Sequence, residues 1–227
     1  MSRVETPEQL TSTARLFSIG HSNHSIDKFL NLLRSGGVTA IADVRSRPFS
    51  GRYPQFNRPE LEVALREADL AYAFLGHELG GRPGSLSLYD SDGRVDYNRV
   101  RRTAAFQRGV DRLMRGCEEQ RIAMLCSEED PLECHRGLMI APAMVERGLA
   151  PMHLRGDGSL ETTQQLEQRL IKETGIGVGV LDGLFAATLS EAERRDLLTS
   201  ACRAMAKRKA YRMSPEMPGD SVDDSPE

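Results

Sequence analysis

Short apolar runs alternate along the chain with longer segments in which apolar residues recur at helical spacing. Each run has the length of a strand, and turn-forming or polar residues follow most of them. The runs cover residues 15–20, 38–44, 71–75, 121–126 and 151–155. This pattern predicts about five buried strands.

The segments between these runs predict amphipathic helices. Ser25 can cap the first helix, and Pro59 suits the first turn of the second. Further helices are expected at 106–117, 134–147 and 161–173. Pro142 lies within one of them and predicts a kink or a later start. Residues 82–97 show no convincing period and are expected to form a surface loop.

Strands that alternate with helices are typical of an α/β fold with a parallel sheet. We therefore predict an open, mostly parallel sheet of about five strands flanked by helices over residues 14–157. A C-terminal helical extension is predicted at 158–213, where Ser190 and Glu193 form a capping box. The tail, 214–227, is rich in Pro, Asp and Ser, and we expect it to be an acidic, disordered segment.

Composition narrows the class of protein. The chain has 227 residues, of which 39% are hydrophobic, and this is enough to bury a core without staples. No apolar run approaches the roughly 18 residues of a membrane span, and the N-terminus lacks the apolar stretch of a secretory signal. Four cysteines without such a signal indicate reduced thiols, so we expect a cytoplasmic protein with no membrane partner.

Polar residues follow four of the predicted strands. In an open parallel sheet, ligands bind outside the carboxyl ends of the strands, so these groups are expected to share one edge. They are His21 and Ser22 after the first strand, Asp43, Arg45 and Arg47 after the second, Gly80, Gly81 and Arg82 after the third, and Cys126, Glu128, Cys134, His135 and Arg136 after the fourth.

Several of these residues suit catalysis. Cys126 precedes a loop and a helix, where nucleophilic thiols are found. His21 and His135 suit general acid–base work, with Glu128 and Asp43 as carboxylates beside them. Structural roles stay open as well, because a cysteine can be a small buried strand residue and Asp43 can orient a neighbouring arginine or cap a turn.

Two more specific sites have less support. A cysteine phosphatase loop places arginine six residues after the cysteine, but Leu132 stands six after Cys126 and Ile140 six after Cys134. The signal for a metal site is weak, because Cys134 stands eight positions after Cys126 and no C-x-x-C pair exists. No cofactor is therefore predicted, and zinc stays open.

Two basic segments raise the question of an anionic ligand. The loop at 45–58 holds four arginines and three aromatic residues but no acidic residue, which suits phosphates, carboxylates and bases. Its alternative is a solvated loop whose aromatic residues pack on the core. Residues 194–212 contain seven basic residues and one acidic residue, which suits either a phosphate backbone or a solvated helix face. The net charge of −3 supplies no general attraction to nucleic acid.

Four motifs resemble those of domain-of-unknown-function family 488. They are SIGHSN at 18–23, DVRSRP at 43–48, LGHELGGRP at 75–83 and LCSEEDPLECHR at 125–136. The resemblance covers roughly residues 14–157 and implies a cytoplasmic prokaryotic α/β domain. It implies no activity and assigns no catalytic role to any residue.

The strand-end residues favour an enzyme, either a hydrolase or a transferase. Its ligand would carry a phosphate or carboxylate group, as a nucleotide or nucleic acid does, and Arg45, Arg47 and Arg82 would contact that anion. The alternatives are a non-catalytic module that binds nucleotide or nucleic acid, and an interaction module whose polar edge is structural. The sequence carries no signal for oligomeric state.

Overall fold

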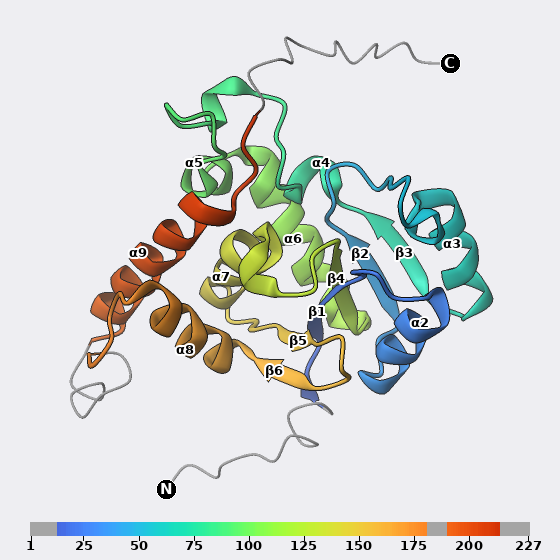
Figure 1. Ribbon diagram of the computed structural model, residues 1–227. Coiled ribbons are helices and arrows are strands. Elements are labelled where there is room, and N and C mark those ends of the chain that lie inside the picture. The colour runs from blue at the N-terminus through green and yellow to red at the C-terminus, as the bar shows by residue number, and fades with distance from the viewer. Residues whose placement is uncertain (1–12, 181–189, 214–227) are drawn as a thin grey trace, which may run out of the picture.

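The computed structural model describes residues 13–180 and 190–213. Its centre is one six-stranded sheet in the order β3-β2-β4-β1-β5-β6 (Figure 1). All neighbouring strands are parallel except β6, which pairs antiparallel with β5 at one edge. The strands are β1 (Leu16–Gly20), β2 (Ala40–Asp43), β3 (Ala71–Phe74), β4 (Ile122–Cys126), β5 (Met152–Leu154) and β6 (Leu160–Thr162). The predicted mostly parallel α/β fold is confirmed, with β6 as an additional strand.

Helices cover both faces of the sheet because both faces of the central strands are apolar. In β1, Phe17 and Ile19 enter one core while Leu16 enters the other. The first core is completed by α2 (Ile26–Ser35) and α3 (Arg58–Glu67). The helices on the other face are α6 (Ala104–Glu119), α7 (Ala141–Glu146), α8 (Thr163–Thr174) and α9 (Glu191–Lys209) (Figure 1).

Caps and prolines set the helix ends as the sequence predicts. Ser25 accepts a hydrogen bond from the Lys28 amide, and Ser190 forms the capping box of α9 with Glu193. A π-helical turn, η4 (Arg136–Ile140), precedes α7, and Pro142 lies in the first turn of α7. Of the two predicted outcomes, a kink or a later start, the later start is observed, because α7 begins at Ala141 with the proline in its first turn.

Most of the segment at 82–97 is exposed or half-buried, in agreement with the predicted surface loop, but three of its residues are buried. Tyr89 and Val95 form an isolated antiparallel bridge, and both are buried together with Tyr97. The apolar residues lie at irregular intervals, so no strand or helix period could indicate their burial. The short helical elements of the remaining connections are η1 (Pro54–Phe56), α4 (Gly76–Leu79), η2 (Leu86–Leu88), α5 (Tyr97–Arg101) and η3 (Pro131–Glu133). The predicted disordered tail at 214–227 lies outside the described residues.

A buried histidine joins β1 and β5. The Nδ1 atom of His153 lies 2.7 Å from the Ser18 hydroxyl, and its Nε2 atom is buried without a hydrogen-bond partner among the described residues. Burial, and then the charge of Arg136, lower the pKa of His153 from 6.5 to about 3. The folded protein therefore holds this imidazole neutral where the unfolded chain protonates it.

This histidine predicts a specific loss of stability in acid. Below pH 6.5 the histidine is protonated in the unfolded state but stays neutral in the folded state. The free energy of unfolding therefore falls as the pH falls, by up to about 3 kcal/mol between pH 6.5 and pH 4. We expect His153→Gln to flatten the dependence of unfolding free energy on pH, measured by urea titration. His77→Gln, at an exposed position, should retain the wild-type slope. An unchanged slope in His153→Gln would contradict the prediction.

Candidate functional site

The predicted site begins where β1 and β4 end side by side. The His21 amide donates to the Cys126 carbonyl at 3.0 Å, and the Ser22 amide donates to the Ser127 carbonyl at 2.9 Å. The loop after β4 then crosses Gly20 so closely that a Cβ there would lie 1.7 Å from the Glu128 carbonyl oxygen. Two strand ends that are distant in sequence are thus joined at one edge of the sheet, as expected.

The side chain of Cys126 contacts two titratable groups. Its thiol donates to Glu128 Oε2 at 2.9 Å, and its Sγ lies 3.8 Å from His135 Nδ1. His135 Nε2 lies 2.9 Å from the carbonyl oxygen of Val44. Because a carbonyl only accepts hydrogen bonds, Nε2 carries the ring proton when the ring is neutral, and the Nδ1 lone pair faces Cys126. Three of the predicted catalytic residues therefore meet at one point.

Cys134 completes this cluster from the buried side. The ligand-type atoms of Cys126, Cys134 and His135 all lie within 4.8 Å of one another. Burial raises the pKa of the Cys134 thiol well above its ordinary value, although the Arg136 guanidinium opposes this by donating to its Sγ at 3.1 Å. Cys134 is thus held away from solvent against a buried cation.

Arg136 was expected to contact the ligand, but the structure gives it an internal role. Its side chain is 1% exposed, and it donates to the carbonyl oxygens of Glu128, at 2.5 Å, and Glu129. These bonds fix the backbone of the loop that carries Glu128. Glu128 is an exposed residue, although the hydrogen bond of its carboxylate to Cys126 is partly buried. Partial removal from water opposes its ionisation, but the hydrogen bond from Cys126 and nearby positive charge keep its pKa below the ordinary value.

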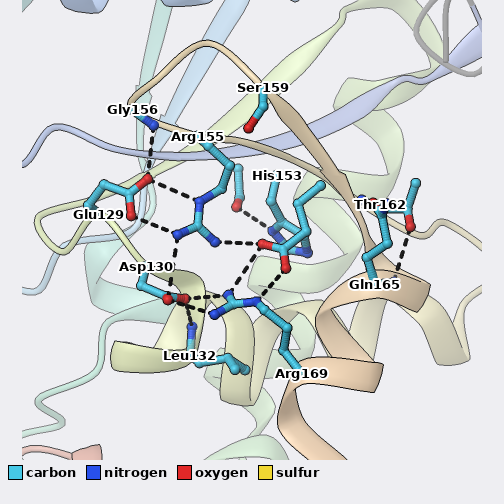
Figure 2. A network of polar contacts seen from close by, with 12 residues as sticks. Glu129, Asp130, Leu132, His153, Arg155, Gly156, Ser159, Thr162, Gln165 and Arg169 are labelled. Atoms are coloured by element: carbon cyan, nitrogen blue, oxygen red, sulfur yellow. Dashed lines mark hydrogen bonds and ion pairs between the residues drawn. The ribbon is translucent and has the colours of Figure 1, made fainter. Parts of the chain in front are cut away.

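The next two residues of this loop are fixed by an ion-pair network (Figure 2). Arg155 binds both carboxylate oxygens of Glu129, at 3.0 and 2.8 Å, and Arg169 binds both oxygens of Asp130, at 2.9 and 2.7 Å. Both arginines also reach Glu161 of β6. Sequence reasoning missed this network because its partners lie far apart in the chain and no local motif links them.

Asp43 and Arg45 form a buried pair on the other face of the sheet. Arg45 donates to both Asp43 oxygens, at 2.9 and 2.6 Å, and to the Phe56 carbonyl at 2.8 Å. Tyr72 donates to Asp43 as well, at 2.9 Å. With Asp43 fully buried and Arg45 4% exposed, the expected anion contact at Arg45 is replaced by an internal ion pair that holds the loop at 45–58.

His21 lies on the same face as this pair. Its ring stacks on Phe56 with 4.4 Å between centroids, and its Nδ1 lies 2.9 Å from the Ser22 carbonyl oxygen. Burial lowers the pKa of His21 to about 4, and the positive charge of Arg45 contributes while Glu128 opposes. The neutral ring keeps an Nε2 atom that is buried and unpartnered among the described residues. The backbones of His21 and Cys126 are thus hydrogen-bonded, but the His21 ring is not among the contacts of the Cys126 thiol.

The loop after β3 lines the cluster from a third side. A Cβ at Gly81 would lie 2.8 Å from the ring of His135, so this glycine lets the loop pack on the imidazole. A Cβ at Gly80 would lie 2.4 Å from the Ser46 hydroxyl oxygen. The Arg82 amide donates to the Ser46 hydroxyl at 2.9 Å, while its exposed guanidinium lies over the Tyr211 ring. The remaining predicted contacts are Arg47, which is exposed, and Ser22, which is half-buried with a positive φ of 48°.

Comparison with models of protein families shows to which family the chain belongs. The family model described as "Domain of unknown function DUF488" matches residues 25–141. The chain belongs to this family. The match contains the motifs at 43–48, 75–83 and 125–136, whereas SIGHSN at 18–23 precedes it. Neither the comparison with curated proteins nor that with solved structures gives a match. Within the described residues, every helix is too short or too polar to cross a lipid bilayer.

Proposed function

We propose that the protein is a hydrolase or transferase acting on a small ligand that carries a phosphate or carboxylate group, such as a nucleotide. The observation that carries this proposal is the convergence of Cys126 with Glu128 and His135 at the end of β4. A single thiol proton there faces two acceptors, a carboxylate oxygen and an imidazole nitrogen. The Cys126 thiol therefore holds the Glu128 carboxylate through a hydrogen bond and orients it at the end of β4.

Glu128 is the proton-transfer group of this proposal because it is the exposed member of the cluster. When water or a hydroxyl group attacks the phosphorus or carbonyl carbon of the ligand, the carboxylate accepts the proton of the nucleophile. The bond to the leaving group then breaks, and the same proton passes to that group. Arg47 and Arg82 are exposed and lie in the loops that follow β2 and β3. Their guanidinium groups can bind the phosphate or carboxylate group of the ligand.

The test is turnover of a panel of nucleotides, phosphate esters and carboxylate esters by wild-type protein and three variants. We expect Cys126→Ser, Glu128→Gln and His135→Asn each to lose about 10²–10⁴-fold in kcat/KM, the usual contribution of acid–base groups. Glu60→Gln changes an exposed carboxylate on α3 and should keep wild-type turnover. Retained folding is checked by circular dichroism. Full turnover in Glu128→Gln and Cys126→Ser would refute the proposal.

A second candidate is non-catalytic binding of nucleotide or nucleic acid, and one cavity favours it. This cavity, of about 740 Å³, lies between α5, α7, α8 and α9, and Arg102, Arg195 and Lys207 are exposed basic residues in its lining. Binding to a phosphate backbone there would weaken steeply with salt. Salt-dependent binding lost in Arg195→Glu, without any turnover, would favour this module over the enzyme.

We also propose a cytoplasmic location. All four cysteines are free thiols, and three of them are buried. Reduced cysteines are the rule where glutathione and thioredoxin maintain thiols. A signal for the protein in a periplasmic rather than a cytoplasmic fraction of its host cells would contradict this.

A further inference from the structure

We infer that Cys126, Cys134 and His135 form a binding site for a divalent transition-metal ion of the zinc class. The inference deepens the proposed function by naming a cofactor. Only the role of the ion in the reaction rests on the proposed function. Binding of the ion follows from geometry, charge and donor chemistry at the cluster.

The donor positions suit a tetrahedral ion. Zinc–sulfur and zinc–nitrogen bonds of about 2.3 and 2.0 Å place two ligand atoms roughly 3.5–3.8 Å apart. Cys126 Sγ and His135 Nδ1 lie 3.8 Å apart, and Cys134 Sγ is within 4.8 Å of both. Small side-chain movements therefore bring all three atoms to bonding distance of one ion.

The orientation of His135 gives an independent indication. A histidine that binds a metal usually donates its other ring N–H to a carbonyl or carboxylate, which fixes both tautomer and ring orientation. His135 places Nε2 2.9 Å from the Val44 carbonyl and directs Nδ1 toward the thiols. Gly81 packs closely against this ring, since a Cβ at that position would lie 2.8 Å from the imidazole.

Charge balance explains how two thiolates can be buried together. Cys126 and Cys134 are 3% and 4% exposed, so two bare thiolates would be strongly unfavourable there. A divalent cation neutralises both, and the buried Arg136 donates to Cys134 Sγ. Thiolate and imidazole donors select zinc and related transition metals over magnesium and calcium, which prefer oxygen.

Three protein ligands leave one position of a tetrahedral ion for water. Glu128 Oε2 lies 2.9 Å from Cys126 Sγ and is thus beside this centre, on its exposed side. Catalytic zinc sites have the same composition of three protein ligands and one water, whose pKa the ion lowers. The carboxylate of Glu128 is placed to accept a proton from that water, which is the step assigned to it in the proposed reaction.

The test uses the purified full chain, stripped with a chelator and titrated with Co²⁺ as a spectroscopic substitute for zinc. We expect one Co²⁺ per chain, visible bands of tetrahedral cobalt, a near-ultraviolet thiolate-to-cobalt band, and displacement by Zn²⁺. Cys134→Ser should weaken binding at least about 100-fold, since even outer-shell changes cost 10–100-fold. The matched control is Cys117→Ser, at another buried cysteine, on α6 outside the cluster, which should bind as wild type does.

Absence of the thiolate-to-cobalt band, or equal binding by Cys134→Ser and wild type, would overturn the inference. Should Cys134→Ser fail to fold, X-ray absorption of the zinc-loaded wild type decides, since it must show two sulfur donors and one nitrogen donor. The two proposals fail separately. Metal binding without turnover of any ligand would refute the enzyme alone, and turnover by a protein that binds no Co²⁺ would refute the metal site alone.

Discussion

Replacing Gly20 with alanine is expected to destabilise the protein by about 3 kcal/mol or more, near the upper end of the usual cost of overpacking. A Cβ at this position would lie 1.7 Å from the carbonyl oxygen and 2.5 Å from the carbonyl carbon of Glu128. Both are backbone atoms, so no rotamer change relieves the overlap. The loop after β4 must move away from β1, and Glu128 moves with it, away from Cys126.

Two measurements check this result together. Urea unfolding gives the free energy of unfolding. Co²⁺ binding reports whether Cys126, Cys134 and His135 keep their arrangement. Gly84→Ala is the matched control, because a Cβ at Gly84 meets no atom within 4 Å. Wild-type stability and cobalt binding in Gly20→Ala would show that the loop after β4 does not depend on this close approach.

The sheet was predictable because its central strands are buried on both faces. Such strands are continuous apolar runs, and β1 and β4, with all five residues of each buried, were found within a residue of their bounds. The missed strand is β6, Leu160–Thr162, which is only half-buried at the edge of the sheet. Three residues with one apolar side chain give no period from which a strand could be predicted.

The joining of the ends of β1 and β4 was predictable from topology alone, since parallel strands end at one edge. The roles of the buried arginines at this edge could not be predicted from the sequence. Arg45 and Arg136 stand among other polar residues in the sequence, and only the structure shows that they are 4% and 1% exposed. The sequence does not distinguish an arginine that contacts a ligand from one that neutralises a buried carboxylate or donates to backbone carbonyls. Burial in the structure distinguishes them.

The site that we infer for a zinc-class ion does not follow the usual spacing rule for metal-binding cysteines, and the reason is physical. Short C-x-x-C motifs place both ligands in one turn, whereas here Cys126 ends a strand and Cys134 follows η3, one 3₁₀ turn later in the loop. The loop between them is closed by Glu129 and Asp130 through Arg155 and Arg169 (Figure 2). The fold therefore brings the two cysteines together although they are eight positions apart. Sequence rules based on C-x-x-C pairs do not recognise this spacing as a metal site.

Asp43→Asn is expected to cost about 3–5 kcal/mol, the usual penalty for breaking a buried ion pair from one side. The variant leaves the Arg45 guanidinium in a site that is 4% exposed, with its charge uncompensated by the carboxylate it binds through two nitrogens. Tyr72 also loses a charged acceptor. Urea unfolding at neutral pH measures the effect.

A surface pair supplies the control for this prediction. Arg58 and Glu62 form an i,i+4 ion pair at 2.7 Å on the surface, with side chains that are 48% and 39% exposed, so Glu62→Gln should cost less than about 1 kcal/mol. The double variant Asp43→Leu, Arg45→Met removes both buried charges and should recover much of the loss. If Asp43→Asn were no more harmful than Glu62→Gln, the pair would not be what holds the loop at 45–58 in place. Arg47 would then lack a fixed position at the edge where we place the ligand.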